Sequence, residues 1–351
     1  MGLWTGILAG LSVAGSGREV AAADAEAADR FARYTSPALA AHCFGATPGR
    51  AFDADAARQS RLLNRFVRTA SLRAVRRIGE VGIDVLVLKG LGTAFALYAD
   101  PDLRVLGDAD ILVRRGDLGR LIGHLEAEGY RFAAERGRSP WGFIGDASFQ
   151  PMLSADGTVN LDLHVHCDAW PVHRGLSTPA IFAACRRLET PEGEIRVPAA
   201  SHMLFLSATH SARDLFASDC AQSLVDAALL LRREGPTIDW EALRSVAAAA
   251  RSLRPVCTFL ALLARLGVDV SAVPAGLRQP PSGLRRGEFE RLVRDAAALY
   301  PNRVLGWRAR LRREMLVAAE PDVALWRNFR RLAGLLQPGQ GLPAEAVSRT
   351  Q

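Results

Sequence analysis

The sequence has 351 residues, of which 49% are hydrophobic and 23% are charged. This composition excludes a disordered or fibrous protein, and at roughly 150 residues per domain the length predicts about two domains. The 44 basic residues outnumber the 37 acidic ones, and all but one of them are arginine. The exception, Lys89, is either a product of a GC-rich coding sequence or a position where a compact ammonium group does what a guanidinium cannot.

Cysteine spacing and hydropathy indicate a cytoplasmic protein. The five cysteines show no C-x-x-C spacing, which argues against a disulfide framework or a zinc ribbon and favours a reducing compartment. The apolar stretch 2–15 is shorter than the roughly 20 residues that span a bilayer. We predict an amphipathic helix there, with a weak signal peptide as the alternative. No other apolar run is long enough to cross a membrane, so we expect no membrane contact.

The first elements in chain order are helical. Residues 20–80 place Leu62, Phe66, Leu72, Val75 and Ile78 at helical spacing, which predicts a helix. The β-branched run 83–88 predicts a buried strand, and residues 91–98 a helix that ends at the Asp-Pro break.

A second group of elements completes an α/β unit. Residues 108–113 predict a strand and residues 118–128 a helix that Gly129 can end. Residues 149–153 and 159–166 predict strands joined by the Asp156-Gly157 turn, and residues 188–197 a smaller hairpin.

From Ser201, which can cap a helix, the pattern is helical to about residue 335. We therefore predict an N-terminal helical segment (1–80), an α/β core (81–200), a C-terminal helical domain (201–335) and a loose tail (336–351).

The strand at 108–113 carries a pair of carboxylates. Because strand side chains alternate between faces, Asp108 and Asp110 project together while Ala109, Ile111 and Val113 face the core. Two carboxylates on one face repel each other unless a cation lies between them. Magnesium fits this position because it takes oxygen ligands and pairs with substrate phosphates. The alternative is an exposed strand face with two unrelated acids.

The strand at 159–166 has the same alternation. Its odd positions are apolar, and Asn160, Asp162, His164 and His166 share the other face. Asp162 is thus a third carboxylate for a metal cluster. The two histidines permit a rival interpretation, a zinc or other transition-metal site.

Two basic residues near these strands are candidates for phosphate binding. Lys89 and Gly90 stand where a strand runs directly into a helix, whose first N–H groups can bind an anion. The Walker A pattern is absent. Arg104, four residues before Asp108, can also reach a phosphate or form an ordinary surface ion pair.

The positive charge is concentrated in the last hundred residues, where 17 arginines face eight acids. This surplus is either a solvated helical face or a basic wall that attracts a polyanionic substrate. Few aromatic residues are interleaved with it, so a dedicated nucleic-acid binder is not favoured.

The order and spacing of these motifs resemble the bacterial uncharacterised nucleotidyltransferase family, within the DNA polymerase β-like nucleotidyltransferase superfamily. The sequence departs from the family pattern at Val165, where the family normally has Trp. Its Lys-Gly turn is common in the family but replaces the Gly-Ser or Gly-Gly turn that is usual in the superfamily. The similarity covers about residues 60–235 and is carried by Val87-Leu88-Lys89-Gly90, Tyr98, Arg104-x-x-x-Asp108-x-Asp110, Glu128-Gly129-Tyr130, Asp162-Leu163-His164, residues 204–210 and Asp226.

The resemblance implies an α+β fold, a small mixed-sheet nucleotidyltransferase core flanked by the N-terminal helical segment and the C-terminal helical domain. It implies an enzyme that moves a nucleoside monophosphate from an NTP to an unknown acceptor (a small molecule, peptide or protein) and releases pyrophosphate. Asp108, Asp110 and Asp162 would hold Mg²⁺ or Mn²⁺ in two-metal catalysis. Lys89 and Gly90 would hold the triphosphate.

His164 would orient a carboxylate or touch the acceptor, or only pack against the sheet edge. We expect His210 and Asp226 to be hydrogen-bond partners between helices rather than catalysts. Two other functions remain open: a catalytically silent binding module in a biosynthetic cluster, and a metal hydrolase that uses His164 and His166.

Overall fold

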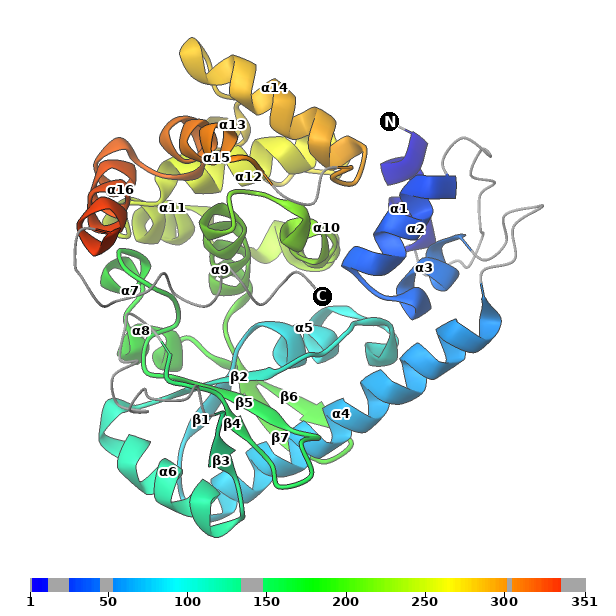
Figure 1. Cartoon of the computed structure of the whole chain (residues 1–351), viewed down its shortest axis with the longest axis vertical. Helices are drawn as coiled ribbons and strands as arrows, with labels where there is room; N and C mark the ends of the chain where they lie inside the picture. Colours follow the sequence, from blue (N-terminus) through cyan, green and yellow to red (C-terminus); the bar gives the residue numbers. More distant parts are fainter. Residues whose placement is uncertain (1, 12–24, 45–52, 134–147, 302–304, 336–351) are drawn as a thin grey trace.

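The computed structural model describes residues 2–11, 25–44, 53–133, 148–301 and 305–335 (Figure 1). A small sheet lies at one end of the molecule and most of the helices gather at the other. This confirms the predicted α+β class, a small mixed sheet flanked by helices. The predicted tail and the end of the first predicted helix lie outside the described residues.

The main sheet has five strands in the order β1-β2-β5-β4-β3. Only β2 and β5 run parallel; the other neighbours in this sheet are antiparallel. The two predicted hairpins are both present, as β4–β5 and as the separate two-stranded sheet β6–β7. The strands are β1 (Val85–Val87), β2 (Ala109–Val113), β3 (Arg131–Phe132), β4 (Met152–Leu153), β5 (Asn160–His164), β6 (Arg186–Thr190) and β7 (Gly193–Val197).

The helices fall before, between and after these strands. Short 3₁₀ turns are η2 (Pro101–Leu103), η3 (Arg115–Asp117), η5 (Ser218–Cys220) and η6 (Gly235–Thr237), and η7 (Glu314–Ala318) is a π-helix. The α-helices are α1 (Gly2–Gly10), α2 (Ala25–Tyr34), α3 (Pro37–Phe44), α4 (Ala54–Glu80), α5 (Lys89–Leu97), α6 (Leu118–Ala127), α7 (Val172–Gly175), α8 (Thr178–Ala183), α9 (Ala200–Arg213), α10 (Ala221–Glu234), α11 (Trp240–Ala249), α12 (Leu253–Arg265), α13 (Ala275–Arg278), α14 (Leu284–Ala297), α15 (Trp307–Arg313) and α16 (Pro321–Leu335).

Several boundaries differ from the sequence prediction, and β1, β4 and β5 are shorter than the strands predicted at 83–88, 149–153 and 159–166. The single helix predicted over residues 20–80 is divided into α2, α3 and α4, and Pro37 begins α3 because proline is tolerated in the first turn of a helix but breaks its interior. Helix α5 begins at Lys89, two residues earlier than predicted. Helix α9 is preceded by Ala199, which has no capping side chain, and Ser201 lies within its first turn. The predicted Ser201 cap is therefore wrong.

The two faces of the sheet belong to different hydrophobic cores. Ile111 and Leu163 pack in one core with residues of α4 and α6. Leu112, on the opposite face of β2, packs with the helices of the C-terminal half, including Phe205 of α9. Because side chains alternate along a strand, the polar even-numbered residues of β2 and β5 share this second face. They therefore lie between the sheet and the helical half.

Helix α4 buries an apolar face only in its C-terminal half. Leu62 and Phe66 are 65% and 60% exposed, contrary to the apolar face predicted from their spacing. The N-terminal half turns Asn64 and Arg68 inward instead, where the side chain of Arg68 pairs with the carboxylate of Asp102. A buried ion pair thus replaces apolar packing where α4 passes η2.

The N-terminal helices pack against the C-terminal ones. The indole of Trp4 is buried and donates a hydrogen bond to the carbonyl of Ala296 at 2.9 Å. Tyr34 donates to the carbonyl of Tyr300 at 3.1 Å. Residues of α1, α2 and α3 thus share one core with the helical half. The boundaries predicted at residues 80, 200 and 335 stay predictions.

The C-terminal arginines form many of the ion pairs between helices. The buried carboxylate of Glu288 accepts from Arg291, Arg312 and Arg313. Glu314, also buried, accepts from Arg331. Several arginines thus share a few acids, and these pairs join α14, α15, η7 and α16. Among the helices in the described part of the chain, none has the length and hydropathy needed to cross a membrane.

Candidate functional site

The parallel pairing of β2 with β5 brings the predicted acidic residues together. The register places Asp110 opposite Asp162, and Leu112 opposite His164. Residues opposite each other on neighbouring strands point to the same face, so the polar side of both strands forms one surface. This register joins residues more than 50 positions apart in the sequence.

Asp110, Asp162 and His164 form a compact group of potential metal ligands. One ligand atom from each of them lies within 4.8 Å of the other two. Nε2 of His164 is 2.9 Å from Oδ1 of Asp110 and 3.2 Å from Oδ2 of Asp162. Asp110 and His164 are each only 4% exposed. We call these three residues the Asp-Asp-His cluster.

Lys89 completes the charge balance of this cluster. Its Nζ lies 2.6 Å from Oδ1 of Asp110. Its backbone φ is 39°, in the left-handed region that non-glycine residues seldom occupy. The strand-to-helix turn therefore holds Lys89 in a strained conformation that directs its ammonium group at Asp110. Strain of this kind concentrates at functional sites.

On β5, three buried polar atoms have no hydrogen-bond partner among the described residues. They are Oδ1 of Asp162, Nδ1 of His164 and the side-chain oxygen of Asn160. Buried polar groups without partners are costly, and each one points to a missing partner. An unpaired carboxylate oxygen beside a second carboxylate fits a divalent cation, so the residues present pass this test for Mg²⁺ or Mn²⁺.

The neighbouring charges shift the pKa values of the cluster in opposite directions. Burial alone would raise the pKa of Asp110, but Lys89 and His164 hold it well below its usual range. Burial alone would lower the pKa of His164, but hydrogen bonds and charges from Asp110 and Asp162 raise it to about 9. At neutral pH, two cations therefore neutralise the buried carboxylates.

Asp108 lies two residues before Asp110, on the N-terminal side of β2. It precedes β2 and is exposed, and it does not belong to the group of three whose ligand atoms converge. Desolvation by the surrounding protein and the charge of Asp110 raise the pKa of Asp108 to about 6. Its carboxylate is therefore near enough to Asp110 to respond to its charge.

Arg104 forms an ion pair with the helical half. Its guanidinium binds the carboxylate of Asp226 on α10, with Nη2 2.8 Å from Oδ2. Tyr98 donates to the same carboxylate at 2.7 Å. This confirms the expectation that Asp226 is a hydrogen-bond partner between elements. A Cβ atom at Gly90 would stand 2.8 Å from Nη1 of Arg104, so the close approach of this guanidinium requires glycine.

A second polar group faces Lys89 from the helical half. Asp168, 4% exposed, accepts hydrogen bonds from Thr209 at 2.9 Å and from Arg213 at 2.8 Å, both on α9. The charges of Asp168 and Arg213 both act on the pKa of Lys89. The sequence analysis missed this Asp168–Arg213 pair. The available signal was an acidic residue just beyond the end of a strand that carries site residues.

In the described part of the chain, neither His166 nor His210 belongs to the Asp-Asp-His cluster. His166 stacks on His173 with ring centroids 4.5 Å apart, and among the described residues it is not part of the ligand group. His210 accepts from Arg213 at 2.5 Å, a contact within α9 rather than between helices. Burial, Arg213 and Lys89 lower the pKa of His210 to about 3.

Residues 37–267, more than half of the chain, match the family model described as "Uncharacterised nucleotidyltransferase". No curated protein matches the chain. Among solved structures, it is similar to the crystal structure of an antigenic nucleotidyltransferase-like protein from Paracoccidioides brasiliensis. That similarity has 14% identity and a TM-score of 0.37, and covers 60% of this chain and 96% of the other.

Proposed function

The chain belongs to the uncharacterised nucleotidyltransferase family, and from this premise we propose that it transfers a nucleoside monophosphate from an NTP to an acceptor and releases pyrophosphate. The observation that carries the proposal is the pairing of Asp110 with Asp162 across parallel strands, with Lys89 and His164 in contact with the carboxylates. The family membership supports a nucleotide substrate, and the carboxylates support a divalent cation.

Asp110 and Asp162, together with Asp108, would hold Mg²⁺ or Mn²⁺. When bound, such ions neutralise phosphate charge and polarise the phosphorus that is attacked. The buried and unpaired Oδ1 of Asp162 is the free oxygen that such a role requires. His164, between the two carboxylates, would fix their orientation.

Lys89 would act both before and after the nucleotide binds. Without nucleotide, its ammonium group neutralises Asp110 at 2.6 Å. With a cation on the carboxylates, the same mobile group would be available to a phosphate. We propose that Lys89 and the Gly90 turn receive the triphosphate. Arg104 would contact a phosphate only after leaving Asp226.

The transfer step is a substitution at the α-phosphorus. An acceptor hydroxyl oxygen forms a bond to this phosphorus while the bond to the bridging oxygen breaks, and pyrophosphate leaves with that oxygen. Asp162 would take the hydroxyl proton. Holding the acceptor and nucleotide in line supplies much of the rate enhancement.

Nucleotide binding tests the first half of the proposal without a known acceptor. Calorimetric titrations of the full chain with the four α,β-methylene NTP analogues, in Mg²⁺, should show binding of at least one. Asp110→Asn and Asp162→Asn should weaken it more than about tenfold. Glu126→Gln, an exposed change on α6, should bind like wild type. Equal binding by all variants, or none by wild type, contradicts the proposal.

Pyrophosphate release from the bound NTP then tests the chemistry. Mg²⁺-dependent release should disappear in the Asp108→Asn/Asp110→Asn double variant. Nucleotide binding without release in the presence of metabolite, peptide and protein acceptor pools would instead identify a silent binding module. Stoichiometric zinc in the purified protein would favour a metal hydrolase.

A further inference from the structure

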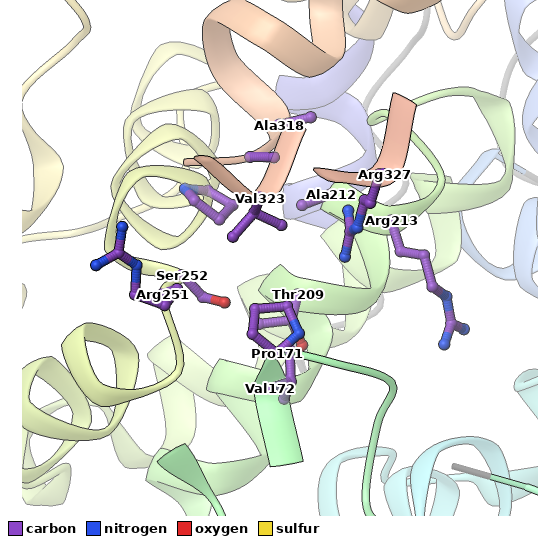
Figure 2. A pocket seen from close by; sticks show the side chains of 12 residues that line it. Pro171, Val172, Thr209, Ala212, Arg213, Arg251, Ser252, Ala318, Val323 and Arg327 are labelled. Atoms are coloured by element: carbon purple, nitrogen blue, oxygen red, sulfur yellow. The ribbon is translucent and has the colours of Figure 1, made fainter. Parts of the chain in front are cut away.

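A small pocket opens in the helical half beside the Asp168–Arg213 pair (Figure 2). Its walls come from α9, the segment before α12, the end of η7 and α16. It is small and partly open to solvent. That space suits a small chemical group rather than a whole nucleotide.

Three arginines line the pocket, and their hydrogen-bond and ion-pair partners differ. Arg213 pairs with Asp168 at 2.8 Å, and Arg251 with Asp322 at 2.6 Å. Arg327 forms no ion pair with any described residue; it makes a long hydrogen bond of 3.5 Å to the carbonyl of Trp170. Figure 2 shows Arg213 and Arg251 extending away from the pocket centre, whereas Arg327 reaches toward Thr209.

The surroundings make a lone guanidinium at this position costly. Arg327 is half-buried, and burial lowers its pKa. The two acids whose charges oppose this shift, Glu314 and Asp168, are already paired with Arg331 and Arg213. An incompletely compensated cation beside two other arginines attracts an anion.

The rest of the lining strengthens such an interaction. Val323, Ala318 and Pro171 are apolar and line the same pocket as Arg327 (Figure 2). Apolar walls exclude water, and a charge pair is stronger where the dielectric constant is lower. Guanidinium groups bind carboxylates and phosphates with paired N–H donors.

We infer that this pocket binds an oxyanion, a carboxylate or phosphate group that the acceptor carries; this inference rests on the proposed function. Thr209 and Arg213 line the pocket and also hold Asp168. The negative charge of Asp168 contributes to raising the pKa of Lys89. The pocket is therefore joined through Thr209 and Arg213 to Asp168, which lies four residues beyond His164 at the end of β5. The group in the pocket then belongs to the second substrate.

Binding of inorganic phosphate and of acetate to the full chain tests the pocket. We would measure both by calorimetry in EDTA at constant ionic strength. Arg327→Gln should weaken the binding of at least one of them about tenfold or more, since a hydrogen bond to a charged group is lost. Arg327→Lys should keep part of the affinity. The matched control is Arg330→Gln, an exposed change one turn further along α16, which should bind like wild type. Equal binding by wild type and Arg327→Gln overturns the inference.

A second titration distinguishes the source of the anion. Under the inference, Arg327→Gln leaves the affinity for the Mg²⁺–nucleotide analogue unchanged, while Asp110→Asn weakens that affinity and keeps phosphate or acetate binding. If Arg327→Gln weakens nucleotide binding by the same factor as phosphate binding, the pocket serves the triphosphate and the acceptor assignment is wrong. Failure of the proposed function appears separately, as loss of nucleotide binding in wild type. Unfolding curves of each variant verify that it is folded.

Discussion

Nζ of Lys89 lies 2.6 Å from Oδ1 of Asp110, so the single lysine of the chain neutralises the most buried carboxylate of the Asp-Asp-His cluster. A short ammonium group on a flexible stem fits between the strand-to-helix turn and β2. A planar guanidinium at the end of a longer side chain would need a different position. This contact makes Lys89 more than a result of codon usage.

Replacing Lys89 tests how much this contact stabilises the protein. Lys89→Met should lower the free energy of unfolding by about 1.5–3 kcal/mol, because a hydrogen bond between charged groups is lost. Urea denaturation in EDTA measures the change. Arg76→Met, which breaks an exposed pair with Glu80, should cost less than about 1 kcal/mol. Equal losses in the two variants would contradict a stabilising role for Lys89.

Lys89→Arg tests function rather than stability. The charge is kept, but the guanidinium cannot occupy the position of Nζ beside Asp110. We therefore expect the affinity for the Mg²⁺–nucleotide analogue to fall about tenfold. Calorimetric titration measures it. Unchanged binding would indicate that the lysine at position 89 only reflects the base composition of the coding sequence.

His164 should make stability depend on pH. Its pKa is raised from 6.5 to about 9 in the folded protein, so its contribution is fully present below pH 6.5 and is lost as the pH rises through about 9. The difference in unfolding free energy between wild type and His164→Gln should shrink over this range, by about 3 kcal/mol at most. Denaturation in EDTA at several pH values measures it. The exposed change His42→Gln should give no such trend, and a constant difference for His164→Gln would contradict the assignment.

Asp108 should make metal binding depend on pH at lower values. Its pKa is raised to about 6, and a carboxylate must lose its proton to bind a cation. The affinity for Mn²⁺ should therefore fall by up to about tenfold per pH unit below pH 6. Calorimetric titrations between pH 5 and 7 measure this. Asp108→Asn should bind more weakly with a flat profile, and a flat profile in wild type would exclude Asp108 as a ligand.

The Arg104–Asp226 pair should join the core to the helical half. The two side chains are 12% and 7% exposed, so Asp226→Asn leaves a buried guanidinium without its counter-charge. The expected loss is about 3–5 kcal/mol in unfolding free energy. Asp322→Asn, which breaks the exposed pair with Arg251, should lower the unfolding free energy much less. Similar losses would show that burial does not govern the Arg104–Asp226 pair.

The strand patterns correctly predicted which residues share a face. Alternation is a property of the extended backbone itself, so the common face of Asp162 and His164 needed no knowledge of the fold. The apolar residues of β2 and β5 were predicted in the same way, and they do pack in the core.

The same kind of reasoning failed for helix α4. Its spacing predicted a buried Phe66, which is exposed, because the partner of this half of the helix is the polar turn at Asp102. Periodicity shows that a helix has two faces. Which one is buried depends on the element that packs against it.

The sequence by itself thus determined the strands other than β3, the faces of their side chains and the position of Lys89 at a strand-to-helix turn. Only the tertiary structure decided that β2 pairs in parallel with β5 in this register, that Arg104 faces Asp226, and that Asp168 and Arg213 approach the site from the helical half. The physical reason is the separation along the chain of the residues that interact. Alternation and turns follow from covalent geometry over a few residues, whereas these contacts join distant segments and depend on how the whole core packs.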